Sequence, residues 1–251
     1  MAAAPHPPVA RVDLAQLLRR AADGRFPQTD GGFSRAAPWR PGVEAAVAFT
    51  GHAVMVVAED VDDGRLVGLG VHGYGGAHDP RTTLALVGAG KVGVLDVLLL
   101  GRGTGGGGRL VARPDLASTE RARHAAQWRD DVRVHGLPDR SSTSLATLSR
   151  GVGGLPEVGL HDADDAADEL LHGVLALVPP GDVVVASVTP GNARSLRFFL
   201  RHGFVPVGSV QQWKPHRPAR STPVDHHGRS PDPSPAAPDQ ASTPAARAGP
   251  A

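Results

Sequence analysis

Residues 183–213 read VVVASVTPGNARSLRFFLRHGFVPVGSVQQW, and three elements follow one another within them. The valine-rich run at 182–188 predicts a buried strand, because β-branched side chains favour extended backbone and form a continuous apolar run here. Residues 192–202 then predict a helix whose apolar stripe consists of Leu196, Phe199 and Leu200. Gly203 ends that helix, and residues 204–213 predict a final strand or strand pair. The alternation of strand, helix and strand indicates an α/β fold.

The residues that precede this segment extend the same alternation. Residues 144–149 and 155–160 predict two antiparallel strands, joined by a glycine-rich turn at 151–154. Asp162 can then cap a helix whose apolar face consists of Ala166, Leu170, Val174 and Leu177. A strand pair, a crossover helix and a buried strand therefore lead into residues 192–213, as expected for a layered sheet with helices on its faces.

The N-terminal half has a less regular pattern. Asp13 can cap a first helix, whose apolar stripe consists of Leu14, Leu17, Leu18 and Ala21. Residues 44–49 and 53–58 predict two strands around a Thr-Gly turn. Residues 92–100 predict a third strand, buried in the sheet, and the glycines that follow it predict a flexible loop.

A polar helix comes next, capped by Ser118 or Thr119 and running to about residue 134. The pattern thus divides the chain into three parts. Residues 1–142 form an N-terminal portion made of a helix, a strand hairpin, a glycine-rich loop and a helix. Residues 143–213 form the regular α/β portion, and residues 214–251 form a tail.

The tail is rich in Pro, Ser and Ala and has almost no large apolar side chains. Such a segment buries too little surface to offset the entropy of ordering it, so the tail is predicted to be disordered from about residue 215. His226 and His227 lie in it and are expected to be solvated rather than to bind a metal. The other histidines show no helical ligand spacing, so we expect no metal site.

Composition excludes several classes of function. The chain has 251 residues, a net charge of +1 and no cysteine. Thiolate catalysis, disulfides and cysteine-ligated metals are therefore excluded, and no overall positive charge favours nucleic acid. No apolar run approaches the roughly 20 residues that span a bilayer, and the proline-rich start does not resemble a secretory signal. We therefore expect a cytoplasmic protein without a membrane or nucleic-acid partner.

Six residues in the C-terminal segment recur in a known family: Asn192, Ser195, Leu196, Phe199, Gly203 and Phe204. With the strand before them, they resemble the last third of the GNAT superfamily of N-acyltransferases. Residues 145–160, LATLSRGVGGLPEVGL, look like the strand pair that precedes the cofactor loop in that family. The resemblance covers residues 145–213. Residues 38–54 and 123–136 also look like an actinobacterial branch of the superfamily.

The resemblance implies a central mixed sheet flanked by helices, in which the fourth and fifth strands splay apart and receive the pantetheine arm of acetyl-CoA. It would place Leu160 on one wall of the gap and Asn192 and Ser195 on the other. The implied reaction moves an acyl group from acetyl-CoA to a small-molecule or protein amine, in a monomer or homodimer. Glu157 is the candidate base. Phe199 stands where many members have a tyrosine acid, and it is expected to pack in the core.

The cofactor loop departs from the family pattern Arg/Gln-x-x-Gly-x-Gly/Ala. The matching residues are Asp162, Asp165 and Ala167, and only Ala167 conforms. Nearby acidic residues would repel a pyrophosphate, which predicts weak binding of acetyl-CoA. The same acids would also suit the positive end of a helix dipole. The alternative is therefore a non-catalytic module that keeps the fold and no longer binds CoA.

A third possibility is a dinucleotide-binding enzyme. Residues 101–106 read GRGTGG, match Gly-x-Gly-x-x-Gly and follow a predicted strand. A dinucleotide site would also need a helix that starts at this loop. The sequence instead continues with two more glycines and then Pro114, so this motif is expected to be a chance match in a glycine-rich chain.

Overall fold

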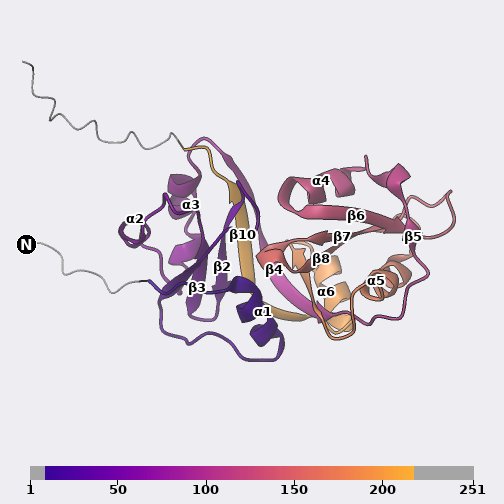
Figure 1. The fold of residues 1–251 in the computed structure, drawn as a ribbon, viewed down its shortest axis with the longest axis horizontal. Helices are drawn as coiled ribbons and strands as arrows, with labels where there is room; N and C mark the ends of the chain where they lie inside the picture. The colour runs from indigo at the N-terminus through magenta and orange to yellow at the C-terminus, as the bar shows by residue number, and fades with distance from the viewer. Residues whose placement is uncertain (1–8, 218–251) are drawn as a thin grey trace, which may run out of the picture. The chain divides into compact units, whose positions relative to one another are not determined.

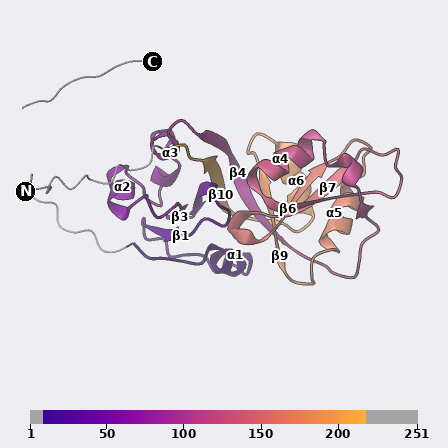
Figure 2. The ribbon, with the colours of Figure 1, turned by 45° about the horizontal axis from the view of Figure 1, so that its top comes forward.

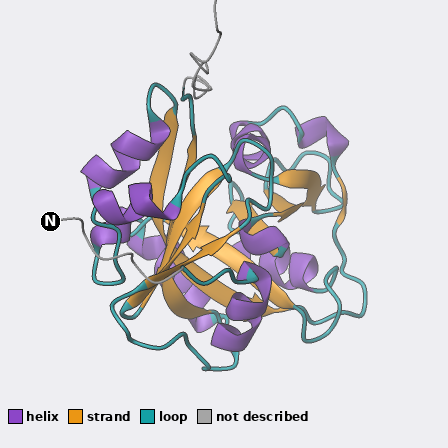
Figure 3. Cartoon of the chain, turned by 60° about the vertical axis from the view of Figure 1, so that its left-hand side comes forward, coloured by secondary structure: helices purple, strands orange, loops and turns teal. Residues whose placement is uncertain are grey.

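The computed structural model describes residues 9–217, and in this part of the chain ten strands join into one mixed sheet. The strand order is β1-β3-β2-β10-β4-β9-β8-β7-β6-β5 (Figure 1). Sequence-distant strands lie at its centre, because β10 from the end of the described chain is inserted between β2 and β4. The α/β class and the mixed sheet flanked by helices are thus confirmed (Figure 3).

The elements predicted from residues 144–213 are present. β7 and β8 form the expected antiparallel pair, β9 follows a crossover helix, and β10 returns antiparallel to β4. Their bounds are β7 (Leu145–Arg150), β8 (Pro156–His161), α5 (Ala167–Leu175), β9 (Val183–Val188), α6 (Ala193–Arg201) and β10 (Val205–Lys214).

The N-terminal elements pack around the other side of β10. Asp13 caps the first helix as predicted, and its carboxylate accepts a hydrogen bond from the Gln16 amide. The predicted hairpin is also present, whereas one edge strand and two short helices were not predicted. The elements are α1 (Leu14–Ala22), β1 (Phe33–Ala36), β2 (Glu44–Phe49), β3 (His52–Val56), α2 (Asp63–Gly68) and α3 (Pro80–Val87).

Strand β4 (Lys91–Arg102) connects the two halves of the sheet (Figure 1). It pairs with β10 along its length, but with β9 only from Val97 onward. The prediction of a buried strand is therefore right for its second half and wrong for its first. Leu98 and Leu99 are fully buried, whereas Val94 is 60% exposed because no strand covers that edge.

The polar helix is shorter than predicted. Thr119 caps α4 (Glu120–Trp128), and the chain then enters β6 (Asp130–Gly136) instead of continuing as helix to residue 134. Asp131 adopts a positive φ of 51° at an irregularity in the pairing of β6 with β7. A short strand, β5 (Val111–Ala112), completes this edge of the sheet.

The apolar face of α6 also differs from the prediction. Phe198 and Phe199 are buried, Leu196 is half-buried, and Leu200 is 46% exposed. The helix is therefore rotated so that its two adjacent phenylalanines face the sheet. Their rings lie edge to face at 5.5 Å between centroids.

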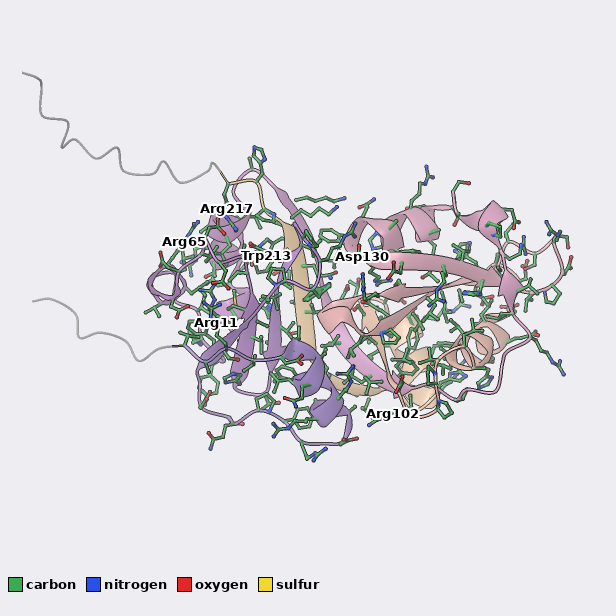
Figure 4. The ribbon with its side chains drawn as sticks, in the orientation of Figure 1. Arg11, Arg65, Arg102, Asp130, Trp213 and Arg217 are labelled. Carbon is green, nitrogen blue, oxygen red and sulfur yellow. The ribbon has the colours of Figure 1, made fainter. Side chains whose placement is uncertain are left out.

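The start of the predicted tail belongs to the fold. Arg217 donates hydrogen bonds to both carboxylate oxygens of Glu44, at 2.7 and 2.8 Å. Trp213 donates its indole N–H to the same carboxylate at 2.9 Å, and both side chains lie at the end of β10 (Figure 4). The remainder of the predicted tail, including His226 and His227, lies outside the described residues.

The helices cover opposite faces of the C-terminal strands. The buried side chains of α5 and α6 form one core with β7, β8 and β9, whereas α4 packs on the other face of β6, β7 and β8 (Figures 1 and 2). Within residues 9–217, none of the helices is long and apolar enough to cross a membrane.

Candidate functional site

A cavity of about 1170 Å³ lies where β8 and β9 separate. The two strands run parallel and share a single paired position, Glu157 with Val185. Beyond that position each strand continues without the other, and α4, α5, α6 and the first half of β4 close the space around them. The cavity therefore opens the sheet from one face to the other.

The edges of the gap carry backbone groups that no strand satisfies. Residues 158–161 of β8 pair with β7 on one side only, and residues 186–188 of β9 pair only with β4. Buried backbone N–H and C=O groups need partners, so an unpaired strand edge in a cavity favours a bound chain with amide groups of its own.

Side chains singled out from the sequence line the part of the cavity on the α5 and α6 face. They are Leu160, Asp165, Ala167, Asn192, Ser195 and Phe199. Leu160 packs against the core that α5 and α6 form with the sheet, and Phe199 is 6% exposed. Asn192 caps α6 by accepting the Ser195 amide at 3.0 Å. Asn192 and Ser195 thus lie at the start of α6, on the opposite wall from Leu160.

The loop between β8 and α5 is held by its own acidic side chains. The Asp162 carboxylate accepts the Ala166 amide at 2.7 Å. Asp164 accepts the Ser142 and Ser144 hydroxyls at 2.6 and 2.9 Å, and these bonds lower the pKa of its carboxyl group. These two acids are therefore engaged in shaping the loop.

Cations balance other acids at this end of the cavity. Asp168 lies 2.8 Å from His202 Nε2 and forms an ion pair with Arg201 at 3.6 Å, and Asp162 lies 3.8 Å from Arg194. These partners reduce the repulsion that the sequence alone predicts for a phosphate. They also bring Arg194 and Arg201 to the cavity wall.

Asp165 has a positive φ of 56°. This left-handed conformation is strained for most side chains and free of strain for glycine. The backbone at Asp165 therefore has a conformation that glycine favours, although the residue is an aspartate. The prediction that Asp162 caps α5 is wrong, because Asp162 accepts the Ala166 amide in the preceding loop and the helix begins at Ala167. α5 has no side-chain N-cap, unlike α1, α2, α3, α4 and α6.

Glu157 lies beneath the cavity rather than in its wall, and it is 1% exposed. Arg129 forms an ion pair with its carboxylate at 2.6 Å, and the Ser187 hydroxyl and the Val152 amide each donate a hydrogen bond at 3.0 Å. Both carboxylate oxygens are thus occupied. In this arrangement Glu157 fixes Arg129 and joins β8 to β9.

The α4 face of the cavity has a different chemistry, which the sequence analysis missed. Asp96, Arg121, His124 and Arg129 line it. The Thr189 hydroxyl donates to Asp96 Oδ1 at 2.9 Å. Burial raises the pKa of Asp96, and the charge of Glu157 adds to this, against the Thr189 hydrogen bond and the charges of Arg129 and Arg121.

Only a weak signal in the sequence points to these residues. Asp96 is the single charged residue in the apolar run at 92–100, and a lone carboxylate in a predicted buried strand is a candidate functional group. Arg121 and Arg129 give no such signal, because arginines on a polar helix normally face solvent. Tyr74, the chain's only tyrosine, is 67% exposed and does not line the cavity.

The glycine-rich motif at 101–106 lacks the helix that a dinucleotide site needs. It begins at the end of β4, and the next elements are β5 and a short 3-10 turn (Pro114–Leu116). Comparison of the chain with protein-family models, with curated proteins and with solved structures finds no match.

Proposed function

We propose that this protein is an N-acyltransferase that moves an acyl group from an acyl-CoA, such as acetyl-CoA, to an amine. The observation that carries the proposal is the cavity at the separation of two parallel strands, because it joins a groove along Leu160, Phe199 and the start of α6 on one face of the sheet to the pocket around Asp96 and Arg121 on the other. A thioester entering from one face and an amine from the other would meet at the gap. The resemblance of residues 145–213 to GNAT acyltransferases supports the same reading.

The groove fits the pantetheine arm in its chemistry. This arm is an extended chain with two amide groups, and the free edges of β8 and β9 offer backbone donors and acceptors on both sides. Leu160 and Phe199 supply apolar contacts along the way. The first turn of α5 leaves amide groups available for a phosphate, and Arg194 and Arg201 add positive charge nearby.

Once the thioester is bound, acyl transfer needs few protein side chains, because the acyl-CoA supplies an activated carbonyl. The chain must orient the amine, accept its proton and exclude water. A carboxylate of raised pKa in the wall of the pocket suits the second task, and Asp96 is in such a position. Glu157 would first have to give up Arg129 to do the same.

Calorimetry with acetyl-CoA tests the proposal most directly. We expect the native chain to bind acetyl-CoA and to release CoA thiol when a panel of amines is added. Ser195→Trp should fill the mouth of the groove and weaken acetyl-CoA by at least about tenfold. The matched control is Arg197→Trp, an exposed position on the same helix outside the cavity wall, which should bind normally.

Absence of both binding and thiol release in the native chain would contradict the proposal. That result would favour the alternative, a module that retains the fold without binding CoA, for which the departures of the β8–α5 loop from the family pattern are the specific observation. Binding without thiol release for any amine in the panel would also support the non-catalytic alternative.

A further inference from the structure

We infer that the acceptor is an amine that also carries a carboxylate, that Arg121 binds this carboxylate beside Arg129, and that Asp96 takes the proton of the amine. This inference rests on the proposed acyl transfer and adds the class of its acceptor. It is drawn from the α4 face of the cavity, where these three side chains lie together.

The unpaired side chain of Arg121 is the first observation that supports this inference. Within residues 9–217 it forms no hydrogen bond or ion pair, although it is only partly exposed on the first turn of α4. Burial and the neighbouring charge of Arg129 both lower its pKa. An unpaired, partly buried cation next to another cation costs stability, and no contact within the fold accounts for its position. An anionic ligand would satisfy it.

Arg129 is the second reason. Its ion pair with Glu157 uses Nη2, while Nε and Nη1 have no hydrogen-bond partner. A methyl group placed on Gly159 would lie 2.9 Å from Thr147 Oγ1, 3.4 Å from Arg129 Nη1 and 3.7 Å from Arg121 Cδ. Both arginines therefore lie over the backbone of β8 at Gly159, which itself lines the cavity. The absence of a side chain at Gly159 lets both arginines pack against this strand at the cavity wall, and a carboxylate bound there would be a bidentate acceptor for guanidinium donors.

Asp96 is the third reason. Thr189 occupies Oδ1, and Oδ2 has no hydrogen-bond partner within residues 9–217. Ser187, two residues earlier on β9, donates to Glu157 in the same way. The two hydroxyls thus fix two carboxylates with different partners: Glu157 pairs with Arg129, and Asp96 keeps an oxygen for a ligand. A free carboxylate and a free guanidinium in one pocket complement the two charged groups of an amino acid.

The step balances with these groups alone. The amine nitrogen forms a bond to the thioester carbonyl carbon, and the carbon–sulfur bond breaks with its electron pair on sulfur. The proton lost by the nitrogen moves to Asp96, and Asp96 then passes it to the CoA thiolate, so that the thiol leaves and Asp96 is again ionised. The carboxylate of the acceptor does not react; its contact with Arg121 holds the amine beside Asp96.

The first experiment needs no acyl-CoA. A panel of N-acetyl amino acids, which are the products of this reaction, is compared with the matching carboxamides by thermal stabilisation and calorimetry. We expect the native chain to bind the carboxylate form of its best ligand about tenfold or more tightly than the amide. Arg121→Met should abolish this preference. Arg123→Met is the control, because Arg123 is exposed on the same helix and does not line the cavity.

The melting temperature of the unliganded variant provides a second readout. Arg121→Met removes an unpaired charge, so the variant should be as stable as the native chain or more stable while it binds the carboxylate more weakly. A clear loss of stability would show that Arg121 supports the fold and would overturn the inference. Equal binding of carboxylates and amides by the native chain would also overturn it.

Turnover measurements then test the role of Asp96 and whether the carboxylate belongs to the acceptor or to the acyl donor. With acetyl-CoA, amino acids should have a kcat/KM at least about tenfold above that of their decarboxylated amines, and Arg121→Met should raise KM more than it lowers kcat. Asp96→Asn should lower kcat by about a hundredfold or more. If succinyl-CoA with neutral amines is the better pair, the carboxylate belongs to the acyl donor and the inference about the acceptor is wrong.

If acetyl-CoA turns over but shows no preference for acceptors with a carboxylate, the inference fails and the proposed function stands. If acetyl-CoA does not bind while the product panel still distinguishes carboxylate from amide, the anion site stands and the acyl transfer fails. The two ideas can therefore be rejected separately.

Discussion

Two carboxylates in this protein, one buried and one half-buried, have opposite surroundings. Glu44, in the N-terminal half of the sheet, accepts hydrogen bonds from Arg217, from Trp213 and from the Ala58 amide. Asp96, in the cavity, accepts one bond from Thr189 and has a raised pKa, chiefly because of burial. A fully paired charge stabilises a fold, whereas a charge left with a free oxygen beside an unpaired arginine is suited to bind a ligand.

The largest effect on stability is expected at Glu44. Its side chain is 2% exposed, so Glu44→Gln leaves the Arg217 guanidinium with only its longer pair to the exposed Asp60 carboxylate at 3.3 Å. We expect the free energy of unfolding to fall by about 3–5 kcal/mol in urea denaturation. The control is Glu59→Gln, because the Glu59 pair with Arg11 is exposed and should contribute less than about 1 kcal/mol.

The same ion pair can be broken from the other side. A chain that ends at Lys214 lacks Arg217, and it should be less stable than a chain that ends at Arg217. Equal stability of these two chains, or a neutral Glu44→Gln, would show that the paired carboxylate does not hold the end of β10. Glu44 would then not be an example of a paired carboxylate that stabilises the fold.

Glu157 is also a paired carboxylate, and substituting it tests whether it stabilises the fold or takes part in catalysis. Its charge is held by Arg129 at 2.6 Å, so Glu157→Gln should cost about 3 kcal/mol of stability. If Glu157 is instead the base, as the sequence analysis proposed, the variant should fold with nearly native stability and lose kcat. Measuring unfolding and turnover on the same preparation distinguishes these outcomes.

Glu157 and its surroundings show which features of the site a sequence can reveal and which it cannot. The strand at 156–161 and the helix at 193–201 follow from local periodicity, whereas the residues of the cavity wall on the α5 and α6 face were implied only by the resemblance to GNAT acyltransferases. The partner of Glu157 could not be found this way, because Arg129 comes from a different element. Periodicity identifies which face of an element is apolar, but not which side chains meet across the sheet.

The errors in the fold have equally local causes. β4 has apolar residues along its whole length, yet only its second half is covered by β9, so its first half forms a wall of the cavity. The helix α4 ends early because residues 130–136 pair with β7, an interaction that helix propensity cannot anticipate. In both cases tertiary pairing outweighed the local pattern.

Substituting Asp96 should change stability less than substituting Glu44, and in the opposite direction. A raised pKa means that the folded chain holds this proton more readily than the unfolded chain, so stability falls as pH rises from the ordinary value of 3.8 through the raised value. Above the raised pKa, this contribution of Asp96 to stability is lost completely. Asp96→Asn removes the titration, so it should be neutral or stabilising at neutral pH and show less benefit at about pH 4.

The neighbours of Asp96 must be considered in the pH dependence of activity. Burial and the charge of Glu157 on β8 raise its pKa, whereas Thr189, just after β9, and Arg129 and Arg121, at the two ends of α4, lower it. His124 titrates in the same pocket with a pKa lowered by burial and by these arginines. We expect kcat/KM to rise with pH as Asp96 loses its proton, and Asp96→Asn to lose this limb; an unchanged profile would exclude Asp96 as the proton acceptor.

The smallest effect concerns the loop between β8 and α5. Asp165 has a φ of 56°, so Asp165→Gly relieves a left-handed backbone and should stabilise the chain by up to about 1 kcal/mol. The variant also removes a carboxylate from the cavity wall, and acetyl-CoA should bind more tightly by an amount that shrinks as salt is raised.

Asp162 provides the contrast to Asp165, since its carboxylate accepts the Ala166 amide at 2.7 Å and so shapes the same loop. Asp162→Gly should therefore weaken acetyl-CoA and destabilise the fold, although it too removes a negative charge. Calorimetry at two salt concentrations on both variants separates charge from geometry. If both variants improve binding equally, repulsion between the acids and the phosphates governs the affinity, and the hydrogen bonds that these acids form in the loop contribute little to its phosphate-binding shape.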